Sequence, residues 1–160
     1  MIPVRELADA WSSVYSNSAA IRSTVAFAHI GGLVGGGGCA IAADRATLRA
    51  LRRDGTFLTA EIDRLQGAHR MVLAGLAAVG ISGVLLWLAN FDAYLQSPVF
   101  WIKMALVGAL FPNGARLAFV ASRARSGSPR DWPALRHACI TSLALWFATT
   151  LVGTILPNVL

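Results

Sequence analysis

Charged residues are scarce in this 160-residue chain, and lysine is almost absent. Only 14% of the residues are Asp, Glu, Lys or Arg, whereas 56% are hydrophobic. A soluble domain carries roughly 25% charged residues. Lys103 is the only lysine among 14 basic residues. This shortage of charge, together with long uncharged stretches, excludes an ordinary soluble protein and predicts one integral membrane domain over residues 1–160.

Motifs of soluble enzymes are also missing. The two cysteines, Cys39 and Cys139, have no CxxC partner and fall in apolar stretches, so we expect no structural disulfide. The chain contains no GxSxG, Walker or HExxH motif. The net charge of +6 does not indicate nucleic-acid binding, because the arginines gather in two loops without a basic face interleaved with aromatic residues.

Four apolar segments are present, and each approaches the roughly 20 residues that a helix needs to cross a bilayer. They cover about residues 24–43, 71–89, 98–120 and 138–156. The sequence therefore predicts an all-α integral membrane four-helix bundle in contact with the lipid bilayer. Apolar residues at helical spacing between Val4 and Tyr15 also predict a short amphipathic helix, either at the membrane interface or packed on the bundle.

The arginines predict the topology. They concentrate in residues 45–70 and 116–136, whereas residues 90–97 contain no basic residue and include Asp92. The positive-inside rule then places both arginine-rich loops in the cytoplasm and both termini on the opposite side. We read Asn90–Ser97 as a loop, and its shortness predicts that spans two and three are antiparallel neighbours.

Span one combines a histidine with many glycines, from His29 to Cys39. His29, Gly32, Gly36 and Ala40 recur at helical spacing and share one face. Small residues let helices approach closely in membranes. Two occupants suit this face: another helix, including one from a larger membrane complex, or a flat ligand such as a porphyrin.

His29 and Lys103 each lie about five residues, or roughly 7–8 Å, inside the outer boundary of their spans. An ionisable group at membrane depth indicates a functional site. Histidine is a common axial ligand of haem iron. A neutral lysine amine is a second possible ligand, and a charged one binds a propionate or another anion. The alternatives are a snorkelling lysine and a histidine that only packs.

Other polar residues gather towards the cytoplasmic side. His69 and His137, each beside an arginine, form a weaker candidate metal site with Asn113, or else they are interfacial side chains. Pro112-Asn113-Gly114 predicts a kink or an end of the third helix. Asp44 and Arg45 at the end of span one are interpreted as a solvated pair at the interface.

Short motifs in the spans add a family resemblance. Span three begins Trp101-Ile-Lys103-Met-Ala-Leu-Val and closes with Asn113-Gly-Ala-Arg116, and span four runs from Leu135-Arg-His to Leu151-Val-Gly-Thr-Ile-Leu-Pro157. The chain resembles the copper-resistance D (CopD) group of bacterial membrane proteins and, more distantly, the HemJ-type membrane proteins. The resemblance implies a bacterial inner-membrane protein, so the arginine distribution would place both termini in the periplasm. The resemblance to the HemJ-type proteins further implies that His29 and Lys103 bind haem b. Asn113 stands where the HemJ-type proteins have a histidine.

Three functions remain open at this point. The first is a haem or redox protein with its site at His29 and Lys103. The second is copper handling near the outer face, as the CopD resemblance implies, with His29 as a metal ligand. The third is a subunit without a cofactor that packs in a larger membrane complex through its glycine-rich face.

Overall fold

The computed structural model describes residues 4–53, 58–125 and 131–159, and these residues form helices joined by short turns. In chain order the elements are α1 (Val4–Asn17), α2 (Ala19–Gly32), the π-helical turn η1 (Leu33–Gly37), α3 (Gly38–Arg52), α4 (Leu58–Ala89), α5 (Phe91–Gln96), α6 (Pro98–Arg125), α7 (Trp132–Ile155) and the 3₁₀ turn η3 (Leu156–Asn158). The predicted all-α fold is confirmed.

Four helical rods are long and apolar enough to cross a membrane: Ala19–Arg52, Ile62–Ala89, Pro98–Arg125 and Trp132–Asn158. Each extends beyond the apolar segment recognised in the sequence. A helix of 34 residues measures about 51 Å, whereas the hydrocarbon layer is about 30 Å thick, so its polar end continues past the lipid. Large apolar side chains face outward, as lipid contact requires; Phe27 is 78% exposed and Phe147 is 64% exposed. The chain is a multi-pass membrane protein.

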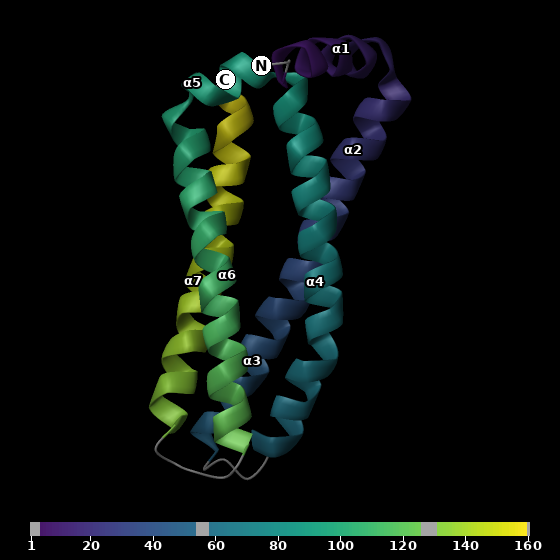
Figure 1. Cartoon of the computed structure of the whole chain (residues 1–160). Coiled ribbons are helices and arrows are strands. Elements are labelled where there is room, and N and C mark those ends of the chain that lie inside the picture. Colours follow the sequence, from purple (N-terminus) through teal and green to yellow (C-terminus); the bar gives the residue numbers. More distant parts are fainter. Residues whose placement is uncertain (1–3, 54–57, 126–130, 160) are drawn as a thin grey trace.

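The rods pack as two pairs (Figure 1). α2, η1 and α3 form one continuous rod that lies along α4, while α6 lies along α7 and α3 reaches α7. α4 and α6 are antiparallel but make few contacts, so they are weaker neighbours than their short connection predicts. That connection is also not a simple loop, because residues 91–96 form helix α5.

We call the end with both termini the terminus end and the opposite end the arginine end (Figure 1). The side of the membrane that each end faces stays a prediction. At the terminus end α1 lies across α4. The Trp11 Nε1–H donates to the Leu85 carbonyl at 2.8 Å, the Ser12 hydroxyl donates to the Ala89 carbonyl at 2.9 Å, and Arg5 pairs with Asp92 at 3.0 Å. The predicted N-terminal helix is confirmed, and it packs on the bundle.

Glycines allow the first rod to cross α4 closely. A Cβ atom on Gly75 would lie 2.5 Å from the Cα atom of Gly36 and 2.7 Å from the carbonyl oxygen of Gly32. These distances are far below normal van der Waals contact, so the two backbones touch directly at this point. The crossing is the membrane packing that small residues permit.

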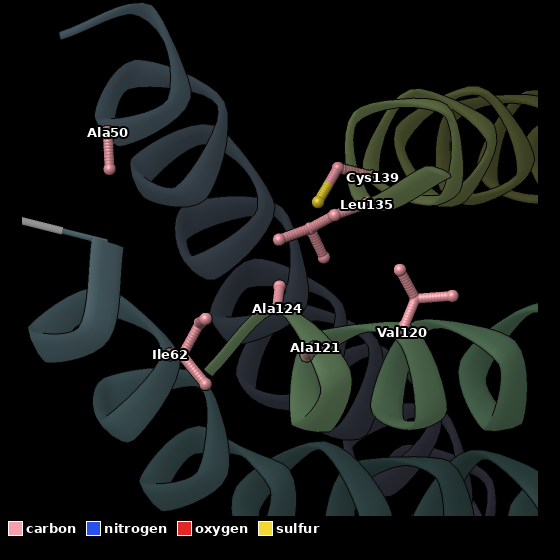
Figure 2. Close-up of a cluster of buried hydrophobic side chains, with 7 residues drawn as sticks. All are labelled: Ala50, Ile62, Val120, Ala121, Ala124, Leu135 and Cys139. Carbon is pink, nitrogen blue, oxygen red and sulfur yellow. The ribbon is translucent and has the colours of Figure 1, made fainter. Parts of the chain in front are cut away.

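Buried side chains gather at the arginine end, where α3, α4, α6 and α7 converge. Figure 2 shows Leu135 of α7 pointing toward α6 at Ala124. Cys139, 0% exposed, belongs to the same cluster and carries a free thiol. Of the kink or helix end predicted at Pro112, the end is wrong, because α6 continues through this residue to Arg125 and supplies one wall of the cluster. The kink stays a prediction.

Candidate functional sites

His29 is held by α4 in a defined orientation. Its Nδ1 atom lies 3.0 Å from the Oγ atom of Ser82, a side chain that is only 2% exposed. The Ser82 hydroxyl donates to the Ala78 carbonyl at 2.5 Å. Because that proton is already used, Oγ accepts the hydrogen bond and Nδ1 carries the imidazole proton. This arrangement favours the tautomer in which the lone pair of the neutral ring is on Nε2.

Lys103 approaches from the other helix pair. Its side chain is half-buried, and a Cβ atom on Gly153 of α7 would lie 3.5 Å from Nζ. The amine thus lies against α7. In the part of the chain that the structure describes, no carboxylate forms a salt bridge with Lys103. His29 and Lys103 both lie in the terminus half of the bundle, on different helix pairs.

The glycine face of the first rod is occupied by α4. A Cβ atom on Gly32 would lie 2.9 Å from the Gly75 carbonyl oxygen, and one on Gly36 would lie 2.9 Å from the Gly75 Cα atom. Of the two occupants that the sequence left open, a helix of this chain is the one found. A porphyrin does not fit against these two glycines.

The weaker candidate metal site is dispersed. His69 lines a cavity between the helices, while His137 Nδ1 lies 2.6 Å from the Pro133 carbonyl and the ring borders a separate hollow. The Asn113 side-chain amide donates to the Ala138 carbonyl at 3.3 Å. Among residues 4–53, 58–125 and 131–159 there is also no group of three His, Cys, Asp or Glu side chains suited to a metal ion.

The sequence analysis missed Asp44. It predicted a solvated residue, which is wrong, because Asp44 is 1% exposed and faces α7. The hydroxyl of Ser142 and the thiol of Cys139 are hydrogen-bonding neighbours of its carboxyl group, but the Oδ2 atom is buried without a partner. The signal was available: Asp44 follows Ala40 by four residues and so continues the inward face of the span.

Asp44 lies at the wall of a cavity of about 500 Å³ between α3, α4, α6 and α7. We call it the Asp44 cavity. The buried wall includes Ile62, Ser142 and Trp146, and exposed residues such as Leu73 and Phe111 lie at its rim. Asp44 follows His29 by 15 residues, so the cavity lies about 22 Å along the same rod. The chain thus has two separate polar sites.

Comparisons with protein-family models, curated proteins and solved structures find no match for this chain.

Proposed function

We propose that this membrane protein binds an amphipathic ligand whose anionic head, a carboxylate or a phosphate, lies between His29 and Lys103. The observation that carries the proposal is that two basic side chains from different helix pairs lie in the same half of the bundle, and no described carboxylate forms a salt bridge with Lys103. An anion there would neutralise the Lys103 ammonium, and His29 would add a second favourable contact once its ring is protonated.

The surroundings support an anion in particular. A lysine ammonium at membrane depth is costly unless a partner neutralises it. Ser82 already orients the imidazole, so His29 presents Nε2 without further rearrangement. Nε2 accepts a hydrogen bond from a protonated acid head, or donates to an anion once the ring is protonated. The apolar tail of the ligand would extend among lipid-facing side chains.

Equilibrium binding of radiolabelled dodecanoate tests the proposal. The protein is placed in phosphatidylcholine nanodiscs, and dodecanol serves as the neutral probe with the same chain length. We expect saturable dodecanoate binding that weakens about tenfold or more in Lys103→Met, because a hydrogen bond to a charged group is worth about 1.5–3 kcal/mol. Dodecanol binding should not change.

Arg5→Met is the matched control. It removes one positive charge at the same end of the molecule, but Arg5 is exposed and its pair with Asp92 lies at the surface. Dodecanoate binding should persist in this variant. Equal losses in the Lys103 and Arg5 variants would show that general charge attraction, not the site, holds the probe.

Haem b is a second candidate ligand, and the orientation of the His29 ring by Ser82 supports it. His29 would hold the iron and Lys103 would bind a propionate; the haem would supply one-electron redox chemistry. The visible spectrum of protein purified from haem-supplemented cells tests this. A Soret band that disappears in His29→Ala supports haem, and a colourless wild-type protein contradicts it. Copper handling has less support, because the described residues offer no three-ligand group.

A further inference from the structure

The inner wall of the Asp44 cavity carries an unsatisfied negative group. Asp44 is 1% exposed, and its Oδ2 atom has no hydrogen-bond partner. Burying a carboxylate without full pairing is expensive. Ser142 and Cys139 provide neutral donors only. A cation supplied from outside the chain would complete this arrangement.

Among the residues that the structure describes, no arginine forms an ion pair with Asp44. Arg45 follows Asp44 directly on α3 and is exposed, so it points about 100° away around the helix. The ion pairs that the structure describes at the arginine end join Arg123 to Asp131 and Arg125 to Asp63, and neither includes Asp44. The carboxylate is therefore available to a ligand.

The rest of the cavity defines the body of that ligand. Its volume of about 500 Å³ falls within the range of roughly 300–1,000 Å³ that is typical of small-molecule sites. Apolar side chains form most of the wall, including Leu76, Leu110 and Ala121. Exposed residues of α4 and α6, such as Leu73 and Ala118, lie at the rim where these two helices make few contacts.

We propose that the Asp44 cavity binds a compact, largely apolar molecule that carries one cationic hydrogen-bond donor, such as an ammonium group. Asp44 Oδ2 accepts the hydrogen bond from the donor, and the apolar body fills the space between α4 and α6. This site is independent of the His29–Lys103 pair, and it prefers the opposite charge.

Three probes that share one adamantane cage test the proposal: 1-adamantylammonium, 1-adamantanol and 1-adamantanecarboxylate. Binding of each tritiated compound is measured on protein in phosphatidylcholine nanodiscs, and binding to protein-free nanodiscs is subtracted. We expect the ammonium compound to bind saturably and more tightly than the alcohol, with the carboxylate weakest. In Asp44→Asn the ammonium compound should bind about tenfold or more weakly, while the alcohol keeps its affinity.

Two further variants locate the binding. Asp92→Asn removes one negative charge at the terminus end, where Asp92 pairs with Arg5, and should leave ammonium binding unchanged. Ala118→Phe fills the rim from an exposed position and should weaken binding of the ammonium compound and the alcohol alike. The proposal is overturned if wild-type protein shows no saturable ammonium binding, if Asp44→Asn binds as tightly as wild type, or if Ala118→Phe has no effect.

Discussion

Because α2 and η1 cross α4 closely at Gly75, we expect a substitution of this glycine to lower the stability of the protein. Gly75→Ala adds one methyl group where the backbone of the first rod already lies, 2.5 Å from the Gly36 Cα atom and 2.7 Å from the Gly32 carbonyl oxygen. Neither contact atom belongs to a side chain that could rotate away. The two helices must separate, and the contacts around the crossing weaken along with them.

The expected magnitude comes from two opposing effects. Overpacking of this kind costs about 1–3 kcal/mol. Replacing glycine by alanine inside a helix returns up to about 1 kcal/mol through helix propensity. Gly80→Ala is the matched control, because Gly80 lies in the same helix and a Cβ atom there has nothing within 4 Å. We therefore expect Gly75→Ala to be less stable than Gly80→Ala by about 1–3 kcal/mol.

Reversible unfolding in mixed detergent micelles, followed by tryptophan fluorescence and circular dichroism, measures both variants under one condition. Gly80→Ala should unfold at the same denaturant concentration as wild type or at a slightly higher one. Gly75→Ala should unfold at a lower concentration than Gly80→Ala. Equal stability of the two variants would refute the close crossing, and with it the conclusion that α4 occupies the glycine face.

Three further predictions concern other contacts. Trp11→Phe removes the hydrogen bond to the Leu85 carbonyl and should cost about 1 kcal/mol, measured by the same unfolding assay; an unchanged stability would contradict the packing of α1 on α4. Pro112→Ala restores a helix hydrogen bond inside α6 and should raise stability by about 1–3 kcal/mol in that assay, whereas a loss would mean that the proline is required. Gly153→Leu should displace the Lys103 amine from α7 and weaken dodecanoate binding, while Gly153→Ala, whose Cβ atom meets Nζ at an ordinary 3.5 Å, should retain it.

Much of the fold could be predicted from composition and periodicity. Lipid imposes long apolar helices, and the four apolar segments marked all four spans. Their ends were less predictable, since α3 continues to Arg52 and α6 passes through Pro112. Where a helix ends outside the lipid is determined by capping and packing, and hydrophobicity does not indicate that residue. Helix α5 was not predicted for a different reason: six residues are too few to show a periodic pattern.

For the candidate sites too, some features could be predicted from the sequence and others could not. That His29 and Lys103 lie at a similar depth could be predicted from the sequence, because the depth of a residue depends only on its position along its span. The occupant of the glycine face and the burial of Asp44 depend instead on how each helix is rotated toward its neighbours. The π-helical turn at Leu33–Gly37 lies between His29 and Asp44, and it changes the rotation of one relative to the other. A single sequence does not reveal such a turn.

The single lysine offers the most direct test of the central claim, that Lys103 presents its amine to an anionic ligand beside His29. Protein labelled with ε-¹⁵N-lysine has one lysine side-chain resonance, which belongs to Lys103. Adding dodecanoate should shift this resonance saturably, dodecanol should not, and His29→Ala should change the position of the free signal. A resonance that does not shift when dodecanoate is added, or that shifts equally with dodecanol, would contradict the proposed site.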